Sequence, residues 1–372
     1  MTDAIIWLVT LPLAGALATL LLPRSATAVA IGAGLATTVA AGLLLFGVAT
    51  QGTLHYEIGG WSAGLGIALR ADGLSALLLM MTALVALAAS VYASTYFSAD
   101  STRASFWPLW LLLWTSLNAL FLSSDLFNLY VTLELLGLSA VSLAALGGKG
   151  TAVAAALRYL LVGLLGSMMF LTGVSLIYAG YGTLDLATLQ RVVEPGPIAW
   201  TALAMMTAGL LLKTALFPLH FWLPPAHASA PAPVSAVLSA LVVKAAFYLV
   251  LRLWLDVFTN VVTQEAANLL GLLGASAVLW GSWRALQAER LKLLAAYSTV
   301  AQLGYLFLFF PLLLALPPGP SRDLAAGGLV MLVLTHGFAK AGLFLAIGII
   351  QQRCGHDIIR DLDGTAQRLP VT

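Results

Sequence analysis

The sequence predicts an all-α polytopic membrane protein, and three observations lead to this fold class. Hydrophobic residues make up 61% of the 372 residues, charged residues make up only 9%, and the mean hydropathy is +0.99. A soluble domain carries about a quarter charged residues, so the composition excludes soluble enzymes, nucleic-acid-binding proteins and disordered scaffolds. Apolar runs of roughly 20 residues, enough to cross about 30 Å of hydrocarbon, recur along the chain. We expect an integral, multi-pass membrane protein.

Polar breaks between the apolar runs define about 11 predicted transmembrane helices. They cover residues 4–22, 27–48, 73–97, 106–121, 126–146, 152–180, 198–222, 230–254, 266–283, 297–315 and 326–350. The first run lacks the Lys/Arg-rich start and the small-residue cleavage site of a signal peptide, so we expect it to be retained. The longest polar connection, residues 49–72, alternates enough to allow a small external β-hairpin.

The distribution of basic residues predicts the orientation of the chain. Of the 17 Lys and Arg residues, ten fall on one side of the predicted spans, four fall on the other side, and three lie within spans. Cytoplasmic loops are enriched in Lys and Arg. The sequence therefore predicts an N-terminus outside and a C-terminus inside.

Five titratable residues lie near the middle of four of the predicted spans, at similar heights. Glu134, Lys213 and Lys244 each lie near the middle of a span, and His336 with Lys340 flank the middle of the last one. An ionisable group in the bilayer interior is costly and persists mainly where it pairs or serves ion movement. Because His336 and Lys340 are four residues apart, they share a helix face. Groups at one height on several helices predict a row along which protons move within the membrane plane.

A structural role is the alternative for each of these residues. Glu134 and Lys213 could form a buried pair that only holds two helices together. Lys244 then lacks an acid of its own, so we expect it to exist partly as the neutral amine, which suits a proton carrier. His336 alone is equally consistent with a hydrogen-bonded core histidine, and the nearby Lys340 favours a relay group.

Pro218 lies inside the predicted span 198–222 and interrupts its hydrogen bonds one turn beyond Lys213. Broken helices often mark transport sites, although a plain kink is equally consistent with one proline. His220 is seven residues from Lys213 and is expected on the same face. His227 follows in a proline-rich inner loop. His220 and His227 are candidate proton uptake residues, and an ordinary loop histidine is the alternative for His227.

No cofactor and no metal site are expected. The single cysteine, Cys354, cannot form an internal disulfide, and no Cys/His spacing typical of zinc, haem or an iron–sulfur cluster occurs. No quinone or nucleotide site is apparent either. Any redox chemistry would belong to another subunit, so we expect no catalytic residue in this chain.

Four sequence segments carry a resemblance to a known family. They are LLLKTALFPLHFWLPPAHASAPAPVSAVLSALVVKAAFYLVLR around Lys213 and Lys244, SSDLFNLYVTLELLGLSAVSL around Glu134, LKLLAAYSTVAQLGYL from Leu291, and LTHGFAKAGLFLAIG from Leu334. Together they resemble the antiporter-like membrane subunits shared by respiratory complex I, membrane-bound hydrogenases and Mrp-type cation/proton antiporters. The fixed order of a lysine, a Pro-His-Phe-Trp-Leu-Pro break, a histidine and a second lysine makes the match specific.

The resemblance implies a role for each buried group. Glu134 would be the acid paired with Lys213, Lys244 would be the central relay, and His336 and Lys340 would belong to the path toward the next half-channel. It also implies two inverted five-helix repeats, each with a broken helix. Within a single membrane domain, 1–372, we therefore expect N-terminal spans at 1–97, a first repeat at 106–254, a partial second repeat at 266–350 and a cytoplasmic tail at 351–372.

This chain departs from the family pattern in two places. Typical members continue with further helices, including a second broken helix that completes the path, and many have a histidine one turn before His336 where this chain has Leu332. The expected explanations are a naturally short or split member that a partner subunit completes, or a truncated product.

The function expected from these features is proton translocation within a multi-subunit membrane complex of the complex I, hydrogenase or Mrp type. The partners would be other membrane subunits, the lipid bilayer and protons, with Na⁺ as the alternative ion, and the resemblance implies a bacterial or archaeal plasma membrane. An Mrp-type Na⁺/H⁺ antiporter subunit is one alternative, and a non-pumping structural or assembly subunit is another. Direct sodium binding prefers several oxygen ligands, and a single acid within the spans gives little support for it.

Overall fold

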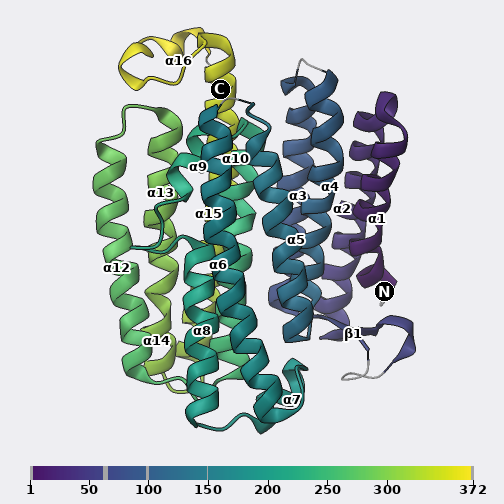
Figure 1. The fold of residues 1–372 in the computed structure, drawn as a ribbon, viewed down its shortest axis with the longest axis vertical. Coiled ribbons are helices and arrows are strands. Elements are labelled where there is room, and N and C mark those ends of the chain that lie inside the picture. The colour runs from purple at the N-terminus through teal and green to yellow at the C-terminus, as the bar shows by residue number, and fades with distance from the viewer. Residues whose placement is uncertain (1–2, 62–65, 98–99, 149, 370–372) are drawn as a thin grey trace. The chain divides into compact units, whose positions relative to one another are not determined.

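The computed structural model describes residues 3–61, 66–97, 100–148 and 150–369 (Figure 1). Within these ranges, 11 helical stretches are long and apolar enough to cross a membrane. They coincide with the 11 predicted spans to within a few residues at most ends, so the predicted fold class is confirmed. The orientation of the chain and the division into repeats stay predictions.

The N-terminal half contains six long helices and one β-hairpin. The long helices are α1 (Asp3–Leu21), α2 (Ala26–Gln51), α3 (Gly73–Tyr96), α4 (Asp100–Leu122), α5 (Leu126–Ala145) and α6 (Gly150–Tyr181), with a 3₁₀ turn at Pro23–Ser25. Strands β1 (Leu54–Glu57) and β2 (Ala68–Ala71) pair antiparallel, from Leu54 opposite Ala71 to Glu57 opposite Ala68. The predicted hairpin in the connection 49–72 is therefore present.

The C-terminal half is interrupted more often. It contains α7 (Leu186–Val192), α8 (Pro197–Thr214), α9 (Leu223–Ser229), α10 (Ala232–Val237), α11 (Val243–Arg252), α12 (Gln264–Leu286), α13 (Leu291–Phe307), α14 (Phe309–Ala315), α15 (Pro320–Cys354) and α16 (Thr365–Arg368). Two π-helical segments, Leu238–Val242 and Leu253–Val257, flank α11. Three residues of the predicted tail, 370–372, lie outside the described residues, as does Lys149 in the connection before α6.

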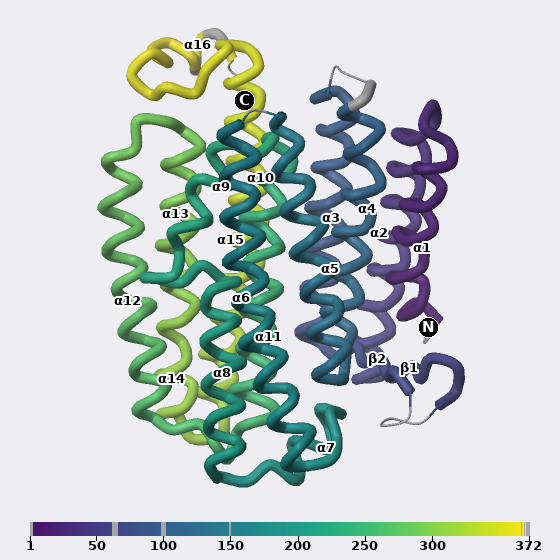
Figure 2. Tube along the Cα trace, viewed as in Figure 1, coloured from purple at the N-terminus to yellow at the C-terminus, as the bar shows by residue number. Residues whose placement is uncertain are grey.

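The chain folds into two compact units, each assembled from segments that are separate in the sequence. The first unit contains Met1–Leu143, Leu160–Lys213 and Lys244–Val262, and the second contains Ala144–Tyr159, Thr214–Val243 and Thr263–Thr372. Figure 2 traces how the chain leaves α8, which ends at Thr214, and passes through α9 and α10 before α11 begins. The Glu134 and Lys213 positions belong to the first unit, and the His336 and Lys340 positions belong to the second.

Glycines allow helices within each unit to approach closely. In the first unit, a methyl group on Gly166 of α6 would lie 2.7 Å from the carbonyl oxygen of Gly209 on α8. In the second unit, a methyl group on Gly274 of α12 would lie 2.7 Å from the carbonyl oxygen of Gly304 on α13. Small residues at such contacts are typical of membrane helices, whose backbones pack without a hydrophobic driving force. The contact between Gly166 and Gly209 also fixes the position of the end of α8.

The predicted span 198–222 is corrected by the structure. Helix α8 ends at Thr214, and Ala215 has a positive φ of 57°. Residues 215–222 form turns that include the cis Phe217–Pro218 bond. Lys213 therefore lies in the last turn of its helix and not near the middle, and Pro218 lies beyond the helix and not inside it.

Candidate functional site

Glu134 and Lys213 form an ion pair inside the first unit. The Lys213 Nζ lies 3.2 Å from Oε1 of Glu134, and the two side chains are 9% and 20% exposed. Ser167 of α6 donates a hydrogen bond to the same carboxylate oxygen. Three helices, α5, α6 and α8, thus supply one carboxylate, one hydroxyl and one amine at a single point.

Two glycines make room for the Lys213 side chain. A methyl group on Gly166 would lie 3.2 Å from Cγ of Lys213, and a methyl group on Gly137 would lie 3.6 Å from its Nζ. Because Lys213 lies in the last turn of α8, the partial negative charge of the helix C-terminus also stabilises its ammonium group. The ammonium is therefore held by a carboxylate and by the helix end.

Lys244 lies in α11 and is 1% exposed, so it is fully buried. A π-helical segment, Leu238–Val242, ends two residues before it. Single π-helical turns are rare and occur frequently at functional sites. The sequence placed Lys244 at the middle of a span, and the observed helical stretch Ala232–Val257 agrees with that position.

His336 and Lys340 lie one turn apart on α15 in the second unit, and both are 5% exposed. The Lys340 Nζ donates a hydrogen bond to the carbonyl oxygen of Ala295 at 3.0 Å and a second one to the hydroxyl of Ser298, both on α13. These two acceptors are neutral oxygens. Lys340 therefore keeps acceptors for its N–H groups whether or not it carries the extra proton.

His227 lies in α9, a short buried helix, and not in the solvated loop that the prolines predicted. Its ring stacks on Phe344 of α15, with centroids 4.7 Å apart, in the second unit. Neither of its ring nitrogens has a hydrogen-bond partner within the part of the chain that the structure describes. The neutral imidazole thus lies in a buried apolar contact, with one nitrogen that can accept a proton.

His220 does not share a helix face with Lys213, which corrects the prediction. Because α8 ends at Thr214, between the two residues, a spacing of seven residues does not place them on one helix face. His220 instead accepts a hydrogen bond at Nε2 from the indole of Trp280, at 3.1 Å, and stacks on Phe217. Its observed contacts hold it within the second unit.

Lys292 is a buried basic residue that the sequence analysis assigned to a connection. It is the second residue of α13 and is 3% exposed. Its Nζ donates to the carbonyl oxygen of Ala230 at 2.8 Å, and its backbone N–H donates to Asp357, which also pairs with Arg290 at 2.9 Å. The predicted spans 266–283 and 297–315 left Lys292 in the connection between them, whereas the apolar run that follows Lys292 was the available signal for a helix.

The chemistry of these groups is limited to charge and proton exchange. Among the described residues, no group of three or more His, Cys, Asp or Glu side chains could hold a metal ion. The first unit offers a carboxylate paired with an amine and a second buried amine, and the second unit offers amines and imidazoles. Such groups can bind, release and pass protons.

Comparison with known proteins gives consistent results. Residues 123–372 match the family described as NADH:quinone oxidoreductase/Mrp antiporter, transmembrane. The NADH-quinone oxidoreductase subunit N of Desulforudis audaxviator is 37% identical over 329 residues, which cover 86% of this chain and 63% of that protein. This chain therefore spans less than two thirds of the length of that relative.

Two solved structures share the fold over nearly the whole chain. A chain of the membrane-bound sulfane sulfur reductase, an archaeal respiratory membrane complex, is 28% identical with a TM-score of 0.91, covering 98% of this chain and 74% of that one. A chain of the Mrp complex from Dietzia sp. is 27% identical with a TM-score of 0.83, covering 94% of this chain and 65% of that one.

Proposed function

Because this chain belongs to the NADH:quinone oxidoreductase/Mrp antiporter transmembrane family, we propose that it is an antiporter-like subunit that moves protons within a multi-subunit membrane complex. The observation that carries the proposal is the buried ion pair between Glu134 and Lys213. A purely structural pair would need no further titratable groups, yet Lys244, His336 and Lys340 are also buried.

The pair would act as the switch of the first unit. With Glu134 ionised at 3.2 Å, the positive charge of Lys213 is stabilised in a medium of low dielectric constant. When the carboxylate moves away or is neutralised, the buried ammonium loses that stabilisation and releases its proton. Lys244 would receive the proton or respond to the change in charge.

The second unit would continue the path through His336 and Lys340. The carbonyl oxygen of Ala295 and the hydroxyl of Ser298 accept hydrogen bonds from either protonation state of Lys340, so the residue can exchange a proton without leaving a buried polar group unpaired. Lys292 and His227, both buried in the same unit, are the residues we assign to proton uptake. His220 would have a supporting role through Trp280.

The partners would be other membrane subunits of a complex I-like, hydrogenase-like or Mrp-like assembly. The relatives named above are a subunit of an oxidoreductase and chains of two multi-subunit complexes. We favour protons over sodium as the transported ion, because Glu134 is the one carboxylate described at the Lys213 site and sodium prefers several oxygen ligands. The reaction that drives transport would take place in a partner.

The test is driven proton transport in sealed membrane vesicles that carry the assembled complex. Glu134→Gln and Lys213→Met should each lower the initial rate to about one hundredth or less of the wild-type rate, in the range expected for loss of a proton-transfer group. The matched control is Glu265→Gln. Glu265 is exposed at the start of α12, so this variant should transport protons at the wild-type rate. Assembly is checked by co-purification of the partner subunits.

Retained transport in both Glu134→Gln and Lys213→Met would contradict the proposal. A structural or assembly subunit predicts a different pattern, in which both variants lower thermal stability and leave the rate per assembled complex unchanged. A direct sodium carrier predicts that transport of sodium, and not of protons alone, is lost.

A further inference from the structure

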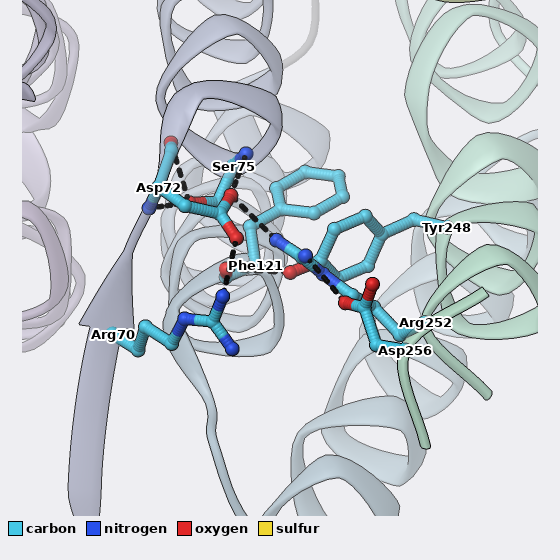
Figure 3. Close-up of polar contacts among 7 residues, drawn as sticks. All are labelled: Arg70, Asp72, Ser75, Phe121, Tyr248, Arg252 and Asp256. Atoms are coloured by element: carbon cyan, nitrogen blue, oxygen red, sulfur yellow. Dashed lines mark hydrogen bonds and ion pairs between the residues drawn. The ribbon is translucent and has the colours of Figure 1, made fainter. Parts of the chain in front are cut away.

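A cluster of four charged residues lies at the β-hairpin end of the first unit (Figure 3). Arg252 at the end of α11 donates from Nη2 to Asp72 at 2.6 Å and from Nη1 to Asp256 at 2.8 Å. Arg70 of β2 lies 3.3 Å from the other oxygen of Asp72. We call these four residues the Arg252 cluster. The guanidinium of Arg252 thus forms ion pairs with two carboxylates on separate segments of the chain.

The guanidinium of Arg252 is also fixed from a third side. Its Cζ lies 4.9 Å from the centroid of the Tyr248 ring, and the Tyr248 hydroxyl donates to the carbonyl oxygen of Phe121 at 3.0 Å. The side chains of Arg252 and Asp72 are only 12% and 13% exposed. A charged group with these restraints has little freedom to swing out of its position.

The cluster is connected to the buried lysine of the first unit by a polar stripe. Lys244, Tyr248, Arg252 and Asp256 follow one another at intervals of four residues, and the other residues of Val243–Arg252 are apolar. Residues four apart share a helix face. The stripe therefore leads along α11 from the fully buried Lys244 to the hairpin end of the unit.

A small cavity lies at the end of this stripe. It is lined by Arg70, Ser123, Ser124, Leu186, Gln190, Tyr248, Arg252 and Asp256. Its volume is about 10 Å³, close to the smallest volume that holds one water molecule. Seven of the eight lining residues are polar or charged, so water would find hydrogen-bond partners there. A proton that left Lys244 along the stripe would meet Arg252 at this cavity.

We propose that Arg252 is a barrier that prevents protons on Lys244 from leaving through the hairpin end of the first unit. This inference deepens the proposed function and rests on it. A guanidinium stays protonated in proteins and accepts no proton, so it cannot pass one on. With both aspartates ionised, the two arginines leave the cluster without a net negative charge that would attract a proton, and the guanidinium itself places a group that cannot relay protons at the cavity. Asp72 and Asp256 keep the group in place and compensate the cost of its burial.

The experiment measures passive proton leak in vesicles that carry the assembled complex, with no driving reaction. A pH step is imposed, and an entrapped pH-sensitive dye reports the decay. Arg252→Gln should raise the leak about tenfold, because it leaves the two aspartates with only Arg70 as counter-charge and removes the group that cannot relay a proton. The matched control is Arg191→Gln, an exposed arginine on α7 of the same unit, which should leak like the wild type.

The double variant Arg252→Gln/Lys244→Met tests whether the leak follows the stripe. We expect its leak to return to the wild-type value. An unchanged leak in assembled Arg252→Gln, or a leak that persists in the double variant, would overturn the proposal. Should Arg252→Gln not assemble, Arg252→Lys keeps the positive charge but replaces the guanidinium by an amine that can release and rebind a proton, and it should raise the leak about threefold; an unchanged leak there overturns the proposal equally.

Driven transport is measured in the same vesicles to separate this inference from the proposed function. Loss of driven transport in Glu134→Gln together with an unchanged leak in Arg252→Gln would support the proposed proton transport and contradict the proposal that Arg252 is a barrier. Retained driven transport in Glu134→Gln and Lys213→Met would contradict the proposed function. A Lys244-dependent leak in Arg252→Gln, measured in the same vesicles, would still support a barrier at Arg252.

Discussion

At the scale of single residues, the same kind of side chain has different meaning in different surroundings. Lys213 faces a carboxylate at 3.2 Å, whereas Lys340 and Lys292 donate to neutral oxygens. An amine beside a carboxylate is sensitive to the position and charge of that carboxylate. An amine beside carbonyl and hydroxyl oxygens keeps its hydrogen bonds in either protonation state. These differences separate the group that would switch from the groups that would relay.

Asp72 provides a prediction about pH at this scale. It lies outside the spans, as the cap of α3, where its side chain accepts from the Ser75 N–H at 3.0 Å. Burial opposes ionisation of the Asp72 carboxyl, but the hydrogen bond and charge of Arg252, with smaller contributions from Ser75 and Arg70, outweigh it and hold the pKa of Asp72 below its ordinary value of 3.8.

A pKa that is lower in the folded state means that ionised Asp72 stabilises the fold. The contribution is complete above the unfolded-state pKa of 3.8 and is lost as the pH falls through the lower folded-state pKa. Asp72→Asn should therefore lower the free energy of unfolding by about 1 to 2 kcal/mol at pH 7. The difference from the wild type should shrink below about pH 4. Thermal unfolding of the purified complex in detergent, at both pH values, measures it; a difference that grows toward low pH contradicts the assignment.

At the scale of the helices, the position of Lys213 depends on how closely α6 and α8 approach. The contact between Gly166 and Gly209 leaves no space for a side chain, and Lys213 lies directly beside it. The end of α8 at Thr214 then releases the backbone from the helix immediately after the lysine. The ion pair is thus set by one close helix contact and one helix end.

Gly166→Ala tests this dependence. The added methyl group would contact the Gly209 carbonyl at 2.7 Å and Lys213 Cγ at 3.2 Å, so the helices must separate. We expect a loss of about 1 to 3 kcal/mol in stability, typical of overpacking, together with slower driven transport. Gly163→Ala on the same helix is the matched control, since nothing lies within 4 Å of its new methyl group. Thermal unfolding and transport rates that are equal in the two variants would exclude a role for the contact.

The sequence predicted the helices well and their ends less well. Hydropathy located all 11 spans because a run of roughly 20 consecutive apolar residues is typical of a transmembrane helix and uncommon elsewhere. It missed the end of α8 because Phe217, Phe221 and Trp222 continue the apolar run beyond Thr214, although Pro218 marked an interruption. It also placed Lys292 in a loop, because hydropathy does not distinguish a charged helix start from a connection.

The contacts between distant residues were not accessible from the sequence. The pairing of Glu134 with Lys213 was expected from the family resemblance, and the structure contains this ion pair. The pairing of Arg252 with Asp72, 180 residues apart, had no comparable signal, since both residues lie at predicted span ends where charges are ordinary. Ser167 was likewise one of many small polar residues until the fold placed it beside Glu134.

At the scale of the whole molecule, buried titratable groups are present in both compact units. The first unit contains the ion pair and Lys244, and the second contains His227, Lys292, His336 and Lys340. A chain that used only one unit for proton transfer would have no need to bury basic groups in the other, given the cost of doing so. We therefore expect transport to require both units.

Lys340→Met tests this requirement. It should lower driven proton transport to about one hundredth or less of the wild-type rate, as expected for a lost relay group. The Glu134 and Lys213 pair in the other unit remains unaltered in sequence. Arg360→Gln is the control in the second unit, because the side chain of Arg360 is 84% exposed. Normal transport in assembled Lys340→Met would restrict the path to the first unit.

The Arg252 cluster also has a mechanical consequence. Its ion pairs tie the end of α11 to the start of α3 and to Asp256, and Tyr248 ties the same helix to the end of α4. The opposite end of α11 adjoins the π-helical segment Leu238–Val242, where the regular hydrogen-bond pattern changes. Because one end of the helix is anchored, any tilt or rotation of α11 displaces its opposite end most, and that is the end at which Lys244 lies.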